Sequence, residues 1–406
     1  MRTLLLTGPG GTGRTTLAAA TALAAARQGT RTLLLGTDRD DTLGAALGMR
    51  TGPAPALVEP RLTVWRPDPA QGFRDGLAAL QDRAASALDL FGAARLDPEE
   101  LTPLPGADDL ALLRALREAA LAEAHDLLVV DLPAAPRALA LLAAPEELRR
   151  CLRRLLPPER QAARALRPVL GRLAGVPLPT GALYETAARW ELELAATEAV
   201  LADRNTVVRL VAEPGPAGAD AVRTAALGLA LRGLRTDLLV ANRVLPEDAP
   251  ADSWLGGPLA QQRKTLAEWQ GTYDVRTVPH LGRDPRGTDD LAALGAPGAL
   301  PEAAPGAQQG AAPGDDAHAA PVEWTVTDRL AEDGVLVWSI PLPGAVREQL
   351  DLVRRGDELA VAAGPFRRTV PLPSALRRCT VDGAALRGDT LTVRFTPDPG
   401  LWPRGR

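Results

Sequence analysis

Residues 8–15 combine closely spaced glycines, a cation and a hydroxyl, a set of groups that can bind phosphate. These residues are Gly8, Gly10, Gly11, Gly13, Arg14 and Thr15. Only a glycine backbone curls closely enough around a phosphate to point several N–H groups at it, and a following helix adds the positive end of its dipole. The spacing is that of a phosphate-binding P-loop, with arginine where lysine is usual. The sequence therefore predicts that this loop binds a nucleotide.

Hydrolysis of that nucleotide is left open by Arg14. A lysine ammonium is a compact charge, whereas a guanidinium is planar, wider and more weakly hydrated. The replacement can keep nucleotide binding and still disturb the geometry of phosphoryl transfer. The arginine at position 14 also fits the composition of the chain, in which arginine replaces lysine almost everywhere. Among the 46 lysines and arginines there is one lysine, Lys264.

Two aspartates follow apolar runs that are predicted to be strands, at 31–35 and 125–131. Asp38 comes shortly after the first run, and Asp131 ends the second. The carboxyl ends of parallel strands lie along one edge of a sheet, so both acids are expected near the P-loop. Asp131 is a hard oxygen ligand of the kind that holds magnesium, and the hydroxyl of Thr15 is suited to the same ion.

A structural explanation of each acid competes with this interpretation. Asp131 could cap the next helix. Asp38 or Asp41 could cap the helix that is expected to begin near Thr42. A cap accounts for one aspartate of this loop, but not for all of them.

The elements that position these groups alternate between apolar runs and helical periodicity. Strands are predicted at 4–6, 31–35, 125–131, 206–211, 236–242 and 273–279. Helices are predicted at 15–27, 107–124 and 145–202, and a further helix follows the strand at 206–211 and ends at 231. In the helix at 107–124, Leu110, Leu113 and Leu116 are expected to face a core. Residues 51–105 are predicted to form loops and short helices. This order predicts an α/β fold, a parallel P-loop sheet flanked by helices with a helical insertion at about 145–202.

The composition changes after residue 295. Residues 296–321 are rich in alanine, proline, glycine and glutamine and are predicted to form a flexible linker. The periodicity then becomes two, and short strands are expected at 335–340, 359–361, 368–370 and 391–395. These strands predict a small antiparallel β-sandwich over residues 322–406.

The overall composition argues against several classes of protein. The net charge of −4 gives no reason to expect nucleic acid or an acidic membrane as the main partner. Cys151 and Cys379 lie too far apart in sequence for a CxxC metal site. No stretch is long and apolar enough to span a bilayer, and the N-terminus lacks a signal-peptide pattern. A reduced, cytoplasmic protein that is not integral to a membrane is the expectation.

The order of these segments resembles the ArsA family of P-loop ATPases, which comprises arsenical-pump ATPases and guided-entry targeting factors for tail-anchored membrane proteins. The resemblance covers residues 1–295. The family's loop, Gly-Lys-Gly-Gly-Val-Gly-Lys-Thr-Thr, corresponds to residues 8–16. Residues 322–406 resemble the small heat-shock (α-crystallin) domain that is appended to some members. The resemblance implies ATP and Mg²⁺ as ligands.

The resemblance also implies roles for individual residues. Asp38 would orient the attacking water, Asn242 would recognise adenine, and Pro279 would begin the loop that closes over the base. The implied nucleotide-binding residues are Gly8, Gly10, Gly11, Thr12, Gly13, Arg14, Thr15, Thr16, Asn242 and Pro279. The implied metal ligands are Thr15 and Asp131.

Four positions depart from the family's pattern. Pro9 and Arg14 stand where its loop has lysines, and Pro136 and Arg137 stand where its second switch has glycine and histidine. The expected function is still an ATP-binding and ATP-hydrolysing protein that couples nucleotide state to a protein client or a membrane-associated partner, as a homodimer. The alternative is a nucleotide-binding chaperone or scaffold that has lost catalysis and acts through the sandwich.

Overall fold

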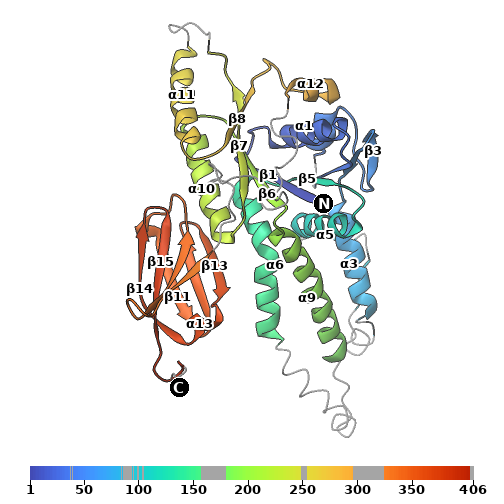
Figure 1. Ribbon diagram of the computed structural model, residues 1–406. Helices are drawn as coiled ribbons and strands as arrows, with labels where there is room; N and C mark the ends of the chain where they lie inside the picture. The colour runs from blue at the N-terminus through green and yellow to red at the C-terminus, as the bar shows by residue number, and fades with distance from the viewer. Residues whose placement is uncertain are drawn as a thin grey trace.

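The computed structural model describes residues 1–36, 38, 40–83, 85, 94, 96–97, 100–102, 105–156, 180–247, 254–295 and 324–402. These residues form an α/β unit and, beside it, a β-sandwich (Figure 1). The two units confirm the predicted fold class. The linker predicted at 296–321 lies outside the described residues.

An eight-stranded sheet lies at the centre of the α/β unit, in the order β3-β4-β2-β5-β1-β6-β7-β8. Its strands are β1 (Arg2–Thr7), β2 (Thr32–Leu35), β3 (Ala56–Glu59), β4 (Leu62–Trp65), β5 (Leu127–Asp131), β6 (Thr206–Ala212), β7 (Thr236–Val244) and β8 (Val275–Pro279). All neighbouring strands pair in parallel except β3 and β4, which are antiparallel. The strand that leads into the P-loop, β1, therefore lies between β5 and β6.

The central strands are mostly apolar because helices cover both faces of the sheet. Leu4, Leu5 and Leu6 of β1 are fully buried, and so are residues 127–130 of β5. The register pairs Leu6 with Asp131, so the end of β5 lies directly beside the start of the P-loop.

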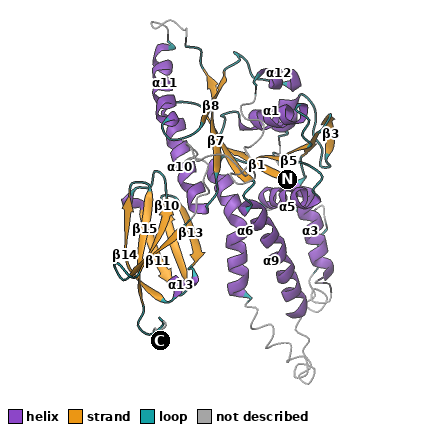
Figure 2. Ribbon diagram, in the orientation of Figure 1, coloured by secondary structure: helices purple, strands orange, loops and turns teal. Residues whose placement is uncertain are grey.

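The helices form two layers (Figure 2). One layer holds α1 (Arg14–Arg27), α2 (Thr42–Leu47) and α12 (Gly287–Ala293). The other layer holds α5 (Ala107–Ala122), α6 (Ala135–Leu155) and α10 (Pro216–Arg232), with α9 (Thr180–Ala202) and α11 (Gly256–Gln270) adding buried residues. The helix α3 (Pro69–Arg83) contacts α5.

Three details of the prediction were wrong. Residues 51–105 contain the strands β3 and β4, because pairing with β2 stabilises a strand too short to show periodicity. The helix α6 begins at Ala135, and Pro145 lies inside it. Leu110 is exposed while Leu113 and Leu116 are buried, because Leu110 lies about 200° around the helix from the buried Leu112.

The sandwich consists of two antiparallel sheets, β14-β15-β10-β9 and β11-β12-β13. Its elements are β9 (Thr325–Arg329), β10 (Val335–Pro341), η2 (Arg347–Gln349), β11 (Leu350–Arg355), β12 (Glu358–Ala363), β13 (Phe366–Pro371), α13 (Ser374–Arg377), β14 (Cys379–Arg387) and β15 (Thr390–Pro397). The predicted strands correspond to β10, β12, β13 and β15. Burial alternates along β12, as expected for strands with one face in a core.

Candidate functional site

The glycine-rich loop between β1 and α1 is open on one side and packed against β6 on the other. A Cβ built on Gly8 would lie 1.9 Å from the carbonyl oxygen of Val211, so only glycine fits there. A Cβ on Gly10 or Gly11 would meet no atom within 4 Å. The loop thus presents its backbone to a space large enough for a ligand.

The loop leads into α1 through a left-handed residue. Gly13 is the N-cap of α1 with φ 82°, and Gly11 has φ 81°, a region that favours glycine. The first N–H groups of α1, at Arg14, Thr15 and Thr16, have no partner within the helix and carry the positive end of its dipole. This arrangement of amides is suited to an anion.

The ends of β6 and β7 hold the loop in place. Thr12 Oγ1 donates to the carbonyl oxygens of Pro9 (2.9 Å) and Val211 (3.2 Å). Asn242 Nδ2 donates to the carbonyl oxygen of Thr12 (2.7 Å), and Arg243 Nη1 donates to that of Gly11 (3.1 Å). Asn242 is thereby a brace of the P-loop, and it also lines a cavity next to it.

Thr15 and Asp131 meet at the bottom of the site, although 116 positions separate them in sequence. Thr15 Oγ1 donates to Asp131 Oδ2 over 2.6 Å. The second oxygen, Oδ1, is buried and has no hydrogen-bond partner. Burial raises the pKa of Asp131 to about 6; Thr15 and Arg14 oppose this, and the charge of Asp38 adds to it. The site therefore holds a negative charge that is not fully compensated.

The sequence left open whether Asp38 and Asp41 cap a helix or belong to the nucleotide site. Asp41 is the N-cap of α2 and accepts from the N–H of Gly44 (3.0 Å). Asp38 Oδ2 accepts from the N–H of Thr42 (2.7 Å), which fixes the carboxylate. Asp38 also faces the same cleft as Asp131. Asp38 can therefore bind the start of α2 and still lie in the cleft.

A cleft of about 1020 Å³ joins these groups. Its lining includes Gly11, Gly13, Arg14, Thr15, Asp38, Asp40, Asp108, Asp109, Asp131, Arg137 and Arg243. Arg14 Nη1 donates to the carbonyl oxygen of Leu132, directly after Asp131. Arg137 pairs with Asp109 (2.9 Å) and Asp108 (3.6 Å) at the start of α5, which raises the pKa of its guanidinium.

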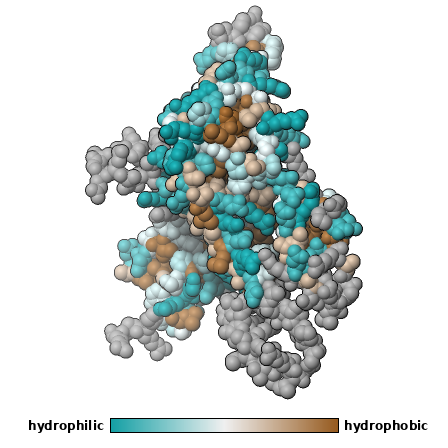
Figure 3. Space-filling model, turned by 90° about the vertical axis from the view of Figure 1, so that its right-hand side faces the viewer, coloured by the Kyte–Doolittle hydropathy of each residue, from teal (hydrophilic) through white to brown (hydrophobic). Residues whose placement is uncertain are grey.

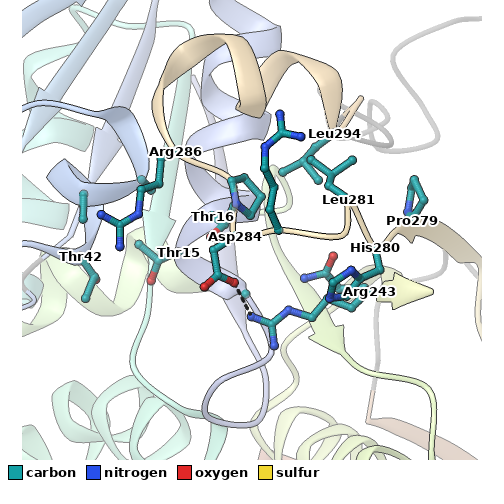
Figure 4. Close-up of a pocket in the computed structure, with 16 residues that line it drawn as sticks. Thr15, Thr16, Thr42, Arg243, Pro279, His280, Leu281, Asp284, Arg286 and Leu294 are labelled. Atoms are coloured by element: carbon teal, nitrogen blue, oxygen red, sulfur yellow. Dashed lines mark ion pairs between the residues drawn. The ribbon is translucent and has the colours of Figure 1, made fainter. Parts of the chain in front are cut away.

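A smaller cavity of about 270 Å³ adjoins the cleft near Gly13 and Thr16. Figure 4 shows Pro279 and His280 on one side, with Arg243 and Asp284 paired across it. The Arg243–Asp284 distance is 3.9 Å. Pro279 ends β8, and Thr16 lies on the opposite wall, as expected for a compartment beside the phosphate loop.

Comparison with protein-family models decides the class of this site. The model of the anion-transporting ATPase, ArsA, matches residues 1–296. The chain belongs to the ArsA ATPase family. A second model, the HSP20-like domain found in ArsA, matches residues 333–395 within the sandwich. The resemblance inferred from the motifs is therefore confirmed, and P-loop nucleotide chemistry is the chemistry of this family.

Several relatives match this chain, and two of those described here bear the names of ATPases. An uncharacterized protein of Streptomyces coelicolor is 85% identical over the whole of both chains. A putative arsenical pump-driving ATPase of Aquifex aeolicus is 23% identical over 97% of this chain and 99% of its own length. The ATPase GET3 of Ajellomyces dermatitidis is 25% identical over 44% of this chain and 52% of its own length.

The residues of this ArsA-family chain fit a magnesium ion. Asp131 Oδ1 is a buried carboxylate oxygen without a partner, beside the hydroxyl of Thr15. Hard oxygen ligands of this kind suit Mg²⁺, which keeps most of its waters and uses few protein ligands. A dication would also offset the charge that burial leaves uncompensated.

Sequence reasoning missed one residue and two contacts of this site. Arg243 was not singled out, although it follows Asn242 and has φ 56°, an uncommon value for arginine. The contact from Arg14 to Leu132 and the pairing of Arg137 with α5 leave no local signal. They depend on side chains that reach between elements.

We expect Gly8→Ala to lower stability and Gly10→Ala to lower ATP affinity instead. The methyl at position 8 must displace the backbone of Val211, and overpacking of this kind lowers the free energy of unfolding by roughly 1–3 kcal/mol or more. The methyl at position 10 meets no protein atom, so stability should stay within about 0.5 kcal/mol of wild type. It occupies the space beside the loop amides, so affinity for ATP should fall.

Urea unfolding and binding of a fluorescent ATP analogue measure the two effects. An equal loss of stability in both variants would contradict the description of the loop. Unchanged ATP affinity in Gly10→Ala would mean that phosphate does not approach this face.

Proposed function

We propose that this chain binds MgATP at the P-loop, hydrolyses it slowly, and couples its nucleotide state to a protein client or a membrane-associated partner. One observation carries the proposal: the loop backbone at Gly11 and Gly13, the Thr15–Asp131 pair and Asp38 all face one cleft. Membership in the ArsA family supports the use of a nucleotide.

Each residue has a role that follows from its position. The N–H groups of Gly10, Gly11 and Gly13 and of the first turn of α1 would bind the phosphates, and Arg14 would add positive charge. Thr15 and Asp131 would hold Mg²⁺, which neutralises charge on the β- and γ-phosphates. Asp38, held by the N–H of Thr42, would accept a hydrogen bond from the attacking water and orient it.

The partner is the least determined part of the proposal. A relative bears the name of an arsenical pump-driving ATPase, and another is GET3. Among the described residues, the C-terminal half of α6 and the middle of α9 expose large apolar side chains. They are Leu148, Leu155, Trp190 and Leu192. We propose that these helices contact the partner, and that the chain works as a homodimer.

Two further observations bear on the partner. None of the helices that the structure describes is both long enough and apolar enough to cross a membrane. On the face drawn in Figure 3, hydrophilic residues cover much of the described surface and hydrophobic ones are interspersed among them. A transient contact with a partner fits such a mixed surface.

A second function is favoured by one specific contact. Arg14, the cation of the P-loop, donates to the carbonyl oxygen of Leu132. If it stays there when ATP binds, its charge does not follow the phosphates during transfer. The chain would then bind ATP without turnover and act as a switch or a scaffold.

Steady-state release of phosphate from MgATP separates the two functions. Slow release that depends on Mg²⁺ and on Asp38 supports the ATPase. Tight ATP binding without release supports the switch or scaffold. Absence of ATP binding would overturn both.

We expect Arg14→Lys to keep ATP binding and to speed phosphate release. The compact ammonium of lysine can follow the β- and γ-phosphates, and it offers no planar fork to the Leu132 carbonyl. A single well-placed cation is worth about tenfold or more in rate. Rates at saturating ATP measure this, with the exposed Arg394→Lys as the control; equal or slower release from Arg14→Lys would contradict it.

A further inference from the structure

The sandwich packs onto the α/β unit through a junction of α6, α10 and β13. Leu227 and Leu231 of α10 belong to the hydrophobic core of the sandwich. Phe366 of β13 contacts that core and also the core of the α/β unit. Figure 1 shows the sandwich lying against the lower end of α10. The two units thus share buried surface.

The centre of this junction has no room for a methyl group. A Cβ built on Gly228 of α10 would lie 2.6 Å from Leu139 Cδ1 of α6. It would lie 2.9 Å and 3.0 Å from two ring carbons of Phe366. Three elements therefore meet at Gly228, and any movement of α6 past this point changes the packing of the sandwich.

Ion pairs add a second set of contacts at the junction. Glu146 of α6 pairs with Arg232 of α10 (3.3 Å) and with Arg368 of β13 (3.2 Å). The Arg232 side chain is 12% exposed and that of Arg368 is 21% exposed, so solvent screens these pairs less than surface ones. Arg368 Nη1 also donates to the carbonyl oxygen of Leu231 (3.1 Å).

The C-terminal half of α6 also forms ion pairs with β12 of the sandwich. Glu358 pairs with Arg150 (3.7 Å) and with Arg154. Arg368 further lies 5.1 Å from the ring centroid of Trp324, a cation–π contact.

The other end of α6 is part of the nucleotide site. The N–H of Ala135, its first residue, donates to the carbonyl oxygen of Gly8 in the P-loop (2.9 Å). The segment just before it holds Asp131 and the Leu132 carbonyl that accepts from Arg14. Leu139 follows one turn later and contacts the junction. One helix thus touches both the P-loop and the sandwich.

We propose that the sandwich acts in cis as a restraint on α6, so that its docking and the binding of MgATP oppose each other. This inference rests on the proposed function. To reach the phosphates, Arg14 must leave the Leu132 carbonyl, which removes one of the contacts that hold the segment before α6 against the P-loop. A shift of α6 must then repack Leu139 against Gly228 and Phe366. Coupling of two sites is reciprocal, so loosening the junction strengthens ATP binding.

The test uses the full chain and a non-hydrolysable fluorescent ATP analogue with Mg²⁺. Arg368→Gln removes the pair with Glu146 and is expected to lower Kd at least about fivefold. Arg394→Gln is the matched control, because Arg394 pairs with Asp382 within β14 and β15 of the same sandwich. Its Kd should equal that of wild type.

A structural readout does not depend on activity. Hydrogen exchange of residues 366–371 should become faster when the analogue binds to the wild-type chain. Unchanged exchange together with equal Kd values in both variants would overturn the restraint and leave the proposed function standing. If wild type does not bind the analogue, both proposals fail.

A second variant changes the residue at the centre of the junction. Gly228→Ala inserts a methyl between Leu139 and Phe366 and should lower Kd in the same direction. Adding Phe366→Ala removes the two ring contacts of that methyl and leaves the one with Leu139, so the two changes should be non-additive. Gly72→Ala in α3, whose Cβ meets no atom within 4 Å, is the helix control. Additive effects in the double variant would contradict contact through Phe366.

Discussion

Asp38→Asn is expected to slow phosphate release by about 10²–10⁴-fold, the range for a lost group that activates the nucleophile. The carboxylate faces the cleft and is oriented by the N–H of Thr42 over 2.7 Å. An asparagine keeps an oxygen that can accept from Thr42, so the start of α2 is preserved. It loses the negative charge with which the carboxylate attracts and orients the proton of the water. Affinity for ATP should therefore change little.

The control is Asp40→Asn. Asp40 lines the same cleft, and its substitution removes the same charge from the same loop. Initial rates at saturating MgATP and binding of the ATP analogue are measured for both variants. A rate that does not respond to Asp38→Asn would remove the ATPase from consideration. Equal losses in the two variants would show that charge in the loop matters and that the position of Asp38 does not.

Asp131→Asn is expected to weaken the effect of Mg²⁺ on ATP affinity. Loss of a group that holds a metal or its water typically costs 10–100-fold in metal affinity, so the ratio of Kd without and with Mg²⁺ should fall about that much. The asparagine oxygen can still accept from Thr15, which keeps the local fold. It no longer offers the charged, unpaired Oδ1 to a cation.

The same substitution should stabilise the chain without ligands. Burial raises the pKa of Asp131 to about 6, above the ordinary carboxyl value, so the ionised form is disfavoured in the fold. At neutral pH, removing that charge should raise the free energy of unfolding, by at most about 3 kcal/mol. A loss of stability would mean that Arg14 and Thr15 already compensate the charge.

Titration of Mg²⁺ into the ATP analogue complex and urea unfolding measure the two effects. Asp126→Asn is the control, since Asp126 lies just before the same strand and pairs with Arg31 on the surface. A response to Mg²⁺ in Asp131→Asn equal to that of wild type would exclude Asp131 as the group that holds the ion.

The glycine loop and the acid at the end of β5 were readable from the sequence because their signals are local. The glycine spacing from Gly8 to Gly13 reflects backbone geometry, and the apolar run before Asp131 reflects a strand buried on both faces. The strands β3 and β4 were missed because each has four residues and lacks the buried leucine run of β2, and β4 is stabilised by its pairing with β2. The nucleotide and metal roles of the site residues stay predictions.

The sequence by itself determined the fold class, the P-loop spacing of residues 8–16 and the family. These rest on residue type and spacing, which act over a few positions of the chain. The tertiary structure alone decided that Asn242 braces the P-loop, that Arg14 reaches Leu132, and that Gly228 meets Leu139 and Phe366. The reason is physical: such contacts depend on the directions of side chains and on the packing between elements, and neither is encoded in local spacing.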